Sequence, residues 1–380
     1  MKIQFLGAAR QVTGSRHFLQ VGDLRLLIDC GMFQERDYLG RNWEPSPVPP
    51  GEIDYVLLTH AHLDHCGLLP RLVAEGFCRP VLATAATRDL AEIVLRDSAH
   101  IQEEDAEFKK NRHQGEGRSG PHPIRPLYTP TDVETAGRLF QPVPYGRPVP
   151  LSDDVTVTYH DGGHILGSAM LEIVVRRNGD TRTIVFSGDI GEWNKPIIRD
   201  PSVFERADYV VMETTYGNRD HREAGPVAEQ LAEVINAAVR RGGNLVIPTF
   251  AIERAQELMF YIGGLLREDR IPHLLVFLDS PMAVNVTEVF LRHRECMDEE
   301  TIAMLQSGRA PCEFPGLKMV QTVAESKAIN RIRGTVVIIA GSGMCTGGRV
   351  KHHLVNNISR PESTILFVGS GLIAFRNLPV

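Results

Sequence analysis

The sequence lacks any CxxC pair, because its six cysteines are scattered singly along 380 residues. Neither a zinc site built from thiolates nor a disulfide framework is therefore predicted. It also lacks an uninterrupted apolar run of about 18 residues, the length that a membrane-spanning helix needs. The N-terminal MKIQFLGAARQVTGSR has no apolar core of the kind found in signal peptides. These absences predict a reduced, soluble, cytoplasmic protein.

The sequence also lacks an excess of positive charge. It has 41 Lys and Arg against 47 Asp and Glu, which gives a net charge of −6 at pH 7. A protein coated in positive charge for nucleic acid is excluded, but a local basic cleft in an acidic protein is not. Hydrophobic residues make up 43% and charged residues 23% of the chain, which argues against a disordered or collagen-like protein. The length suggests two or three domains of about 150 residues each.

The order of predicted elements changes along the chain. Short strands and turns come first, with a buried apolar strand at 54–59, a helix at about 87–112 and a polar loop at 111–126. From about Asp208, strands alternate with helices, which predicts a parallel sheet and a second, different module. We therefore predict an α/β protein with two different modules that meet near residue 208.

The most informative segment is HAHLDH, which directly follows the buried strand. Alternate side chains of an extended backbone share a face, so His60 and His62 project together. Asp64 and His65 fall in the turn that begins a helix and can face a second point in space. The spacing therefore suits two adjacent metal ions better than one, and four such residues in six positions argue against ordinary surface histidines.

Two further ligand candidates lie in segments flanked by glycine, which lets the backbone approach a site closely. His164 lies in DGGHILGS between two predicted strands, and Asp189 lies in FSGDIG after the next one. Asp29 ends the predicted strand LRLLID. It can orient the metal ligands by hydrogen bonds without binding the metal itself. A lone Asp at a strand end is usually a turn residue, so the prediction depends on the whole set.

This set of residues resembles the metallo-β-lactamase superfamily, whose fold is a four-layer αββα sandwich with metal ions at one sheet edge. The resemblance implies two zinc ions bridged by Asp189, with His60, His62 and His164 on the first and Asp64 and His65 on the second. It implies catalytic roles for Asp64 and Asp189. Manganese and iron stay open, because these residue types also suit them. A metal pair about 3.5–4 Å apart activates water and binds a phosphate oxygen.

The second module narrows the resemblance further. ETTYGNR, NLVIPTFAIERAQELMFYI, FLDSPMAVNVTEVF and IAGSGMCTGGRVKHHL resemble the β-CASP domain of RNA-processing nucleases, a family that includes RNase J and the cleavage and polyadenylation endonuclease subunit. The resemblance runs from residue 1 to about 369 and is nearest to the short bacterial and archaeal members. It implies a metallo-β-lactamase domain at 1–207, a β-CASP domain at 208–369 and a catalytic-site acid at Glu213. Residues 370–380 do not resemble the family and form an atypical tail in place of its return segment. The implied activity is zinc-dependent RNA hydrolysis by an endonuclease, with 5′-to-3′ exonuclease action left open.

The glycine turn that begins at Gly341 follows a predicted strand and precedes a helix. Backbone N–H groups in such a turn, together with the helix dipole, favour an anion. The spacing fits neither a P-loop nor a dinucleotide fingerprint. We therefore predict that Ser342, Gly343 and Arg349 bind an RNA phosphate, with a plain tight turn as the alternative.

The chain departs from the family after TILFVG, because the family's return segment carries two histidines and none follows His353 here. We therefore expect a truncated chain without that return segment, an incomplete second zinc site and impaired activity. A non-catalytic RNA-binding or scaffold relative is the main alternative, and a thioesterase or lactonase is a third. The predicted partner is single-stranded RNA, held in a cleft between the modules, with a homodimer and a DNA substrate left open and no membrane.

Overall fold

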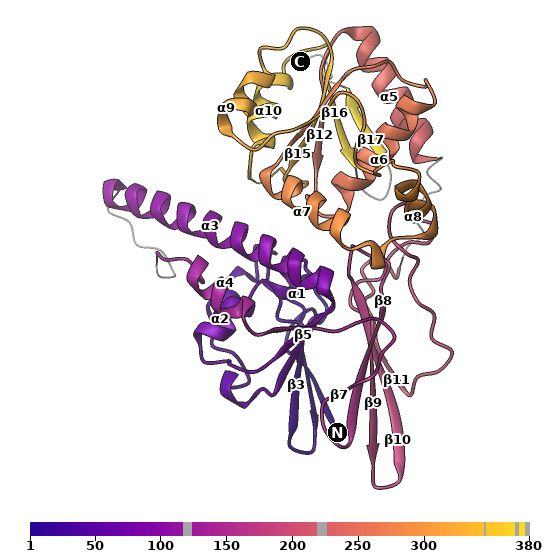
Figure 1. Ribbon diagram of the computed structural model, residues 1–380. Coiled ribbons are helices and arrows are strands. Elements are labelled where there is room, and N and C mark those ends of the chain that lie inside the picture. The colour runs from indigo at the N-terminus through magenta and orange to yellow at the C-terminus, as the bar shows by residue number, and fades with distance from the viewer. Residues whose placement is uncertain (117–123, 219–225, 346, 369–371, 377–380) are drawn as a thin grey trace. The chain divides into compact units, whose positions relative to one another are not determined.

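Figure 1 shows the computed structural model, which describes residues 1–116, 124–218, 226–345, 347–368 and 372–376. The chain divides into two compact units. Residues 1–194 and 200–215 form the first unit, and residues 195–199 and 216–380 form the second. Among the residues that the structure describes, no helix is both long and apolar enough to span a membrane.

The first unit contains a six-stranded sheet in the order β1-β2-β3-β4-β5-β6. Its strands are β1 (Lys2–Phe5), β2 (His17–Val21), β3 (Leu24–Ile28), β4 (Tyr55–Leu57), β5 (Val81–Ala83) and β6 (Phe140–Pro142). The first three pair antiparallel, and β3 to β6 are parallel. Since Ile28 is in register with Leu57, the segments that follow β3 and β4 leave the sheet side by side. This edge brings Asp29 next to the histidine segment.

A second sheet packs on the first, in the order β11-β10-β9-β8-β7. Its strands are β7 (Val149–Pro150), β8 (Val155–Asp161), β9 (Ala169–Arg177), β10 (Asp180–Phe186) and β11 (Tyr209–Val211). Leu19, Leu26 and Leu57 of the first sheet share one apolar core with Tyr159 and Leu171 of the second. β11, which the sequence suggests as the first strand of the second module, pairs in parallel with β10.

The helices of the first unit all lie on one side of the first sheet (Figure 1). They are α1 (Leu63–Cys66), α2 (Leu69–Ala74), α3 (Ala85–Glu116) and α4 (Pro130–Gly137), with 3-10 turns η1 (Leu39–Trp43) and η2 (Pro50–Glu52). Among the described residues of this unit, three of the four predicted layers are therefore present, as one helix layer and two sheets.

Helix α3 continues to Glu116, so the prediction that it ends near Arg112 and that a loop begins at Asn111 is wrong there. Arg112, Gln114 and Glu116 are good helix formers. Gly115 is the first glycine after the start of the helix at Ala85. Residues 117–123 of the predicted loop lie outside the described residues. The next helix, α4, begins with a capping box between Thr129 and Asp132.

The second unit is built on a six-stranded sheet in the order β14-β13-β15-β12-β16-β17. Its strands are β12 (Leu245–Thr249), β13 (Leu275–Asp279), β14 (Leu317–Met319), β15 (Val336–Gly341), β16 (Thr364–Val368) and β17 (Leu372–Arg376). All neighbours pair in parallel except β16 and β17. The predicted parallel sheet is therefore confirmed, and part of the predicted tail forms its antiparallel edge strand.

Helices lie on both sides of this sheet, with α9 and α10 on one side and α5 and α6 on the other (Figure 1). The helices are α5 (Val227–Arg241), α6 (Arg254–Arg267), α7 (Pro281–Arg292), α8 (Glu299–Gln306), α9 (Val323–Ile329) and α10 (Val350–Asn357), with a 3-10 turn, η3 (Arg294–Cys296). Burial on both faces explains why its central strands read as continuous apolar runs. The carboxyl ends of β13 and β15 lie together at one sheet edge.

Candidate metal centre

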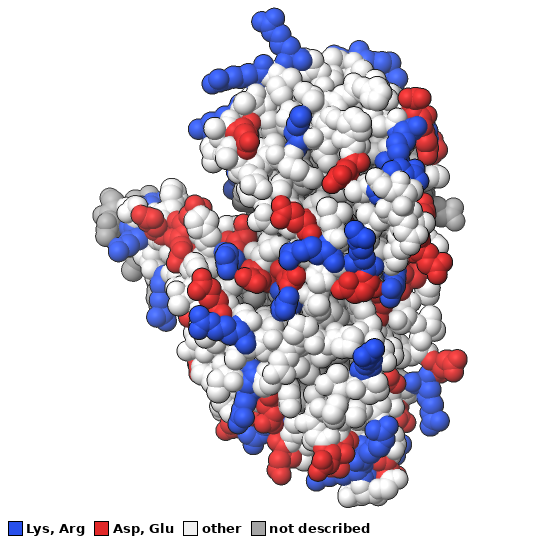
Figure 2. Space-filling view, viewed as in Figure 1, with Lys and Arg blue, Asp and Glu red and all other residues white. Residues whose placement is uncertain are grey.

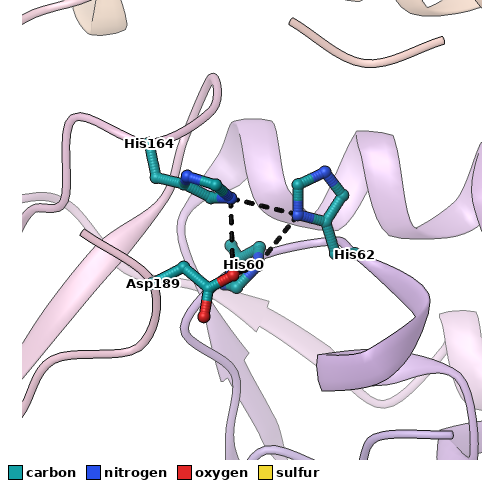
Figure 3. A group of neighbouring side chains, drawn as sticks. All are labelled: His60, His62, His164 and Asp189. Carbon is teal, nitrogen blue, oxygen red and sulfur yellow. Dashed lines mark hydrogen bonds and ion pairs between the residues drawn. The ribbon is translucent and has the colours of Figure 1, made fainter. Parts of the chain in front are cut away.

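Four of the predicted ligands meet at the carboxyl edge of the first sheet (Figure 3). The Nδ1 atom of His62 lies 3.1 Å from Nε2 of His60 and 3.2 Å from Nε2 of His164. The Oδ2 atom of Asp189 lies 3.7 Å from Nε2 of His60 and 3.5 Å from Nε2 of His164. These four ligand atoms all lie within 4.8 Å of one another, so one ion can contact them all.

The donor set fits zinc. Imidazole nitrogen and carboxylate oxygen are ligand types that zinc takes in proteins. His60 is fully buried, whereas the other three side chains are partly exposed. Burial lowers the pKa of His60 well below its usual value, and the nearby His65 lowers it further. His60 is therefore neutral at pH 7, as a metal ligand must be.

The two remaining predicted ligands lie beside the first four. The Nε2 atom of His65 lies 3.1 Å from Oδ1 of Asp189 and 3.9 Å from Oδ2 of Asp64. Asp189 thus directs one oxygen toward His60 and His164 and the other toward His65. The bridging role that the resemblance implies for Asp189 would need its two oxygens in such directions, and that role stays a prediction.

Asp29 fixes the orientation of His65 from beneath the site. Its Oδ2 atom lies 2.7 Å from Nδ1 of His65, and its Oδ1 atom accepts a hydrogen bond from the Thr59 backbone N–H at 2.8 Å. The Thr59 hydroxyl donates to the same carboxylate at 2.9 Å, and the Ser15 hydroxyl lies 3.5 Å away. Asp29 itself has a positive φ of 58°, which turns the chain back toward the cluster.

The charges in this group act on one another. Burial alone would lower the pKa of His65, but Asp29 and Asp189 raise it well above its usual value. Burial alone would raise the pKa of Asp189, but the hydrogen bond to His65 and the nearby His60 and His164 hold it well below its usual value. Without metal, His65 therefore carries the proton and Asp189 is ionised at neutral pH.

Close backbone packing holds the two glycine-flanked loops. Gly188 has a φ of +54°, and a Cβ atom there would lie 2.8 Å from Cβ of Thr59. A Cβ atom on Gly191 would overlap the carbonyl oxygen of Gly163 at 1.6 Å. Only glycine allows these approaches, which bring Asp189 and His164 to the sheet edge.

Glu213 lies in the loop after β11 and ties the Asp189 loop in place. Its Oε1 atom accepts a hydrogen bond from the Ile190 N–H at 3.0 Å, and its Oε2 atom accepts one from the Thr215 hydroxyl at 2.7 Å. Its own N–H donates to the Ser187 hydroxyl at 3.1 Å. Two of these three hydrogen bonds are therefore to the segment that carries Asp189.

The predicted phosphate-binding residues lie in the second unit. Ser342 and Gly343 follow β15, and Arg349 precedes α10. The Arg349 guanidinium donates to Oδ1 of Asp279 at 2.7 Å and to the carbonyl oxygens of two residues after β14. Much of its hydrogen-bonding capacity is thus already used, and its role with RNA stays a prediction.

Asp279 is fully buried and collects two further donors. The Nε2 atom of His353 lies 2.6 Å from Oδ2 of Asp279, and the Ser326 hydroxyl donates to the same oxygen. Hydrogen bonds from His353, Ser326 and Arg349 oppose the effect of burial and lower the pKa of Asp279. This network ties α9 and α10 to the end of β13.

No pattern in the sequence pointed to two hydroxyl residues of the metal centre, Thr59 and Ser168. The Thr59 hydroxyl lies 3.0 Å from Nδ1 of His60, besides its bonds to Asp29. The Ser168 hydroxyl accepts the His164 N–H at 3.1 Å. Thr59 could have been found by its position directly before HAHLDH, but Ser168 carries no distinguishing pattern.

Comparison with known proteins gives two family matches. Residues 14–214 match the metallo-beta-lactamase superfamily, and residues 255–371 match the Beta-Casp domain. Ribonuclease TTHA0252 of Thermus thermophilus is 40% identical over 371 residues, an alignment that covers 97% of this chain and 79% of the ribonuclease. Proteins named transcription termination factor FttA from Methanosarcina mazei and Methanocaldococcus jannaschii are 31% and 30% identical, and in each the alignment covers 56% of the relative.

Proposed function

Because the chain belongs to the metallo-beta-lactamase superfamily and carries its Beta-Casp domain, we propose that it is a metal-dependent ribonuclease. It hydrolyses phosphodiester bonds of single-stranded RNA at the centre formed by His60, His62, His164 and Asp189. The observation that carries the proposal is that the four ligand atoms lie within 4.8 Å of one another. The likeness to a named ribonuclease at 40% identity supports RNA as the substrate.

The chemistry needs a nucleophile, neutralisation of charge on phosphorus and a proton for the leaving group. When bound here, zinc supplies Lewis acidity that activates water and neutralises charge on the phosphate. The protein supplies the geometry, because Asp29 and Thr59 hold His65 and His60 in fixed orientations. The Asp64 carboxylate, close to His65 and partly exposed, would take the proton of the attacking water and pass it to the leaving oxygen, so that the protons balance.

Two zinc ions are part of the proposal, with the second bound by Asp64, His65 and Asp189. The Nε2 atom of His65 lies 3.1 Å from Oδ1 of Asp189 and 3.9 Å from Oδ2 of Asp64, which supports a shared ion. Glu213 acts as a positioning residue, since it holds the loop that carries Asp189. Ser342, Gly343 and Arg349 bind a phosphate of the RNA, as the turn after β15 suggests.

The impairment expected from the sequence finds no support in the described site. The ligand atoms of His60, His62, His164 and Asp189 lie within 4.8 Å of one another, which supports a working hydrolase over a non-catalytic scaffold. The match to the Beta-Casp domain argues against a thioesterase or lactonase. We therefore propose cleavage activity for the chain itself.

The test is cleavage of a short single-stranded RNA by protein loaded with zinc. His62→Ala removes one of the four ligands of the first ion, and we expect the rate to fall at least about a hundredfold because that ion is lost. His273→Ala is the matched control, because His273 is exposed and lies in the second unit. Equal rates for wild type and His62→Ala would show that the observed activity does not come from this centre.

A further inference from the structure

Two arginines of the first unit carry buried N–H donors that the fold does not use. Among the described residues, the Nε atom of Arg16 and the Nη1 atom of Arg71 are buried and have no hydrogen-bond partner. An unpaired buried donor on a charged group costs free energy comparable to its lost hydration. Two such donors, on arginines close enough to act on one another electrostatically, make this part of the unit a candidate site for an acceptor from outside the chain.

The orientation of Arg71 is fixed by its other donors. Its Nε atom donates to Glu75 at 2.7 Å, and its Nη2 atom donates to the carbonyl oxygens of Trp43 and Glu44 at 3.1 and 3.0 Å. Nη1 is therefore held in one direction. A donor that is held in place and left unpaired is prepared for a ligand.

Arg16 is held by packing instead of hydrogen bonds. Its guanidinium lies 5.2 Å from the centre of the Phe33 ring, and the guanidinium of Arg41 lies 5.5 Å from the same centre. Phe33 is buried and therefore gives both cations a fixed apolar support. The Nη1 atom of Arg41 also donates to Oε1 of Gln11 at 3.2 Å, and Arg41 is exposed to solvent.

These cations act on one another electrostatically. Burial lowers the pKa of Arg16, and both Arg71 and Arg41 lower it further, whereas Cys30 and Glu44 oppose the shift. Two of the three guanidinium groups thus lie over the Phe33 ring, and Arg71 is close enough to act on Arg16. A bound anion would relieve this repulsion.

We propose that Arg16, Arg41 and Arg71 form a binding site for a phosphate group, separate from the metal centre. Guanidinium groups present paired donors that match a phosphate, and several of them together suit a doubly charged ion better than a carboxylate. The rival occupant of the two buried donors is an ordered water molecule. The proposal is independent of the ribonuclease activity.

The site is linked to the metal centre through the backbone. Ser15 and Asp29 face each other beneath the metal ligands, and the residues that follow them are Arg16 and Cys30. The Ser15 N–H donates to the Asp64 carbonyl at 2.8 Å, and the Cys30 N–H donates to the His65 carbonyl at 2.7 Å. A phosphate on Arg16 would therefore stiffen the loop that supports Asp64 and His65.

The experiment titrates the protein with inorganic phosphate by calorimetry, with chloride at matched ionic strength as the reference. Phosphate can also bind zinc, so the titration is repeated on His62→Ala, which weakens the metal centre. We expect saturable binding to both proteins. We expect Arg16→Met, which keeps the packing on Phe33, to weaken binding about tenfold or more, since bonds to charged groups are strong. Arg25→Gln, which breaks an exposed pair with Glu52 elsewhere in the unit, is the matched control and should bind normally.

Folding of each variant is checked by circular dichroism, and Arg41→Met provides a second, exposed substitution that should weaken binding severalfold.

A dinucleotide with a 5′-phosphate, compared with its unphosphorylated form, distinguishes a nucleotide from free phosphate as the source. Tighter binding of either probe to wild type than to Arg16→Met or Arg41→Met supports the site. No binding by wild type means that water fills the cluster and overturns the proposal. Binding that is lost in His62→Ala but kept in both arginine variants places the phosphate at the metal centre and also overturns it.

Discussion

At the scale of single residues, Asp29 has more influence on the metal centre than its lack of metal contact suggests. Its carboxylate holds Thr59 and His65 at once, at 2.8 and 2.7 Å. A strand-end Asp is common in proteins, so the sequence alone could suggest this role only through neighbouring motifs. The positive φ of Asp29 and its hydrogen bonds to Thr59 depend on the pairing of β3 with β4, which no local pattern reveals.

Replacing Asp29 by Asn should weaken zinc binding about 10–100-fold, the usual effect of losing a partner behind a metal ligand. The amide offers only one acceptor oxygen in place of two, so it cannot hold Thr59 and His65 together as the carboxylate does. Competition with a coloured chelator measures the affinity. Asp153→Asn is the control, because Asp153 is exposed on the turn before β8. Unchanged zinc affinity in Asp29→Asn would contradict this role.

Binding of the second zinc should depend on pH through His65. The pKa of His65 is raised in the metal-free protein, so the imidazole is protonated at neutral pH and the ion must displace a proton. The affinity for the second ion should therefore rise as pH increases, until the pKa of His65 is passed. Calorimetry in two buffers of different ionisation enthalpy counts the released protons. His65→Gln should lose this release, and identical proton counts in both proteins would refute the assignment.

At the scale of elements, long apolar strands and long helices could be predicted from the sequence, and very short strands could not. β12 and β15 are buried on both faces and read as apolar runs, which marks them as strands in the sequence. β5 and β14 have only three residues each, too few to show a period. Arg349 illustrates the same limit for contacts, because its partner Asp279 lies 70 residues away.

The loop after β10 should not tolerate a side chain at Gly188. Gly188→Ala adds a methyl group against Thr59 at a positive φ, which should destabilise the fold by about 2 kcal/mol or more. The melting temperature and the zinc content should both fall. Gly51→Ala is the control, because a Cβ atom there meets nothing within 4 Å. A Gly188→Ala variant as stable as Gly51→Ala would mean that the loop relaxes freely.

At the scale of the whole molecule, charge is finely mixed. Figure 2 shows Lys and Arg interspersed with Asp and Glu over the face in view, with no large field of one sign there. This agrees with the net charge of −6. The α/β organisation into two modules was predictable because the element pattern changes along the chain, whereas the pairing of β11 with β10 was not.

RNA binding should therefore weaken with salt, though only moderately. Each phosphate contact adds about −0.7 to the slope of log affinity against log salt for a single strand, and a mixed surface offers few such contacts. Fluorescence anisotropy of a labelled single-stranded RNA, with a metal chelator present to stop cleavage, measures the slope. Absence of binding at low salt, or binding insensitive to salt, would argue against phosphate recognition.

The Asp279 network has a consequence for sequence divergence. Ser326, Arg349 and His353 all donate to one buried carboxylate. Losing a single partner of a buried ion pair costs about 3–5 kcal/mol, whereas replacing the whole group by apolar residues can be neutral. A substitution at one of these positions is thus destabilising unless the other positions change with it. Related sequences should retain these four residues together or replace them together, so that they are inherited as a unit.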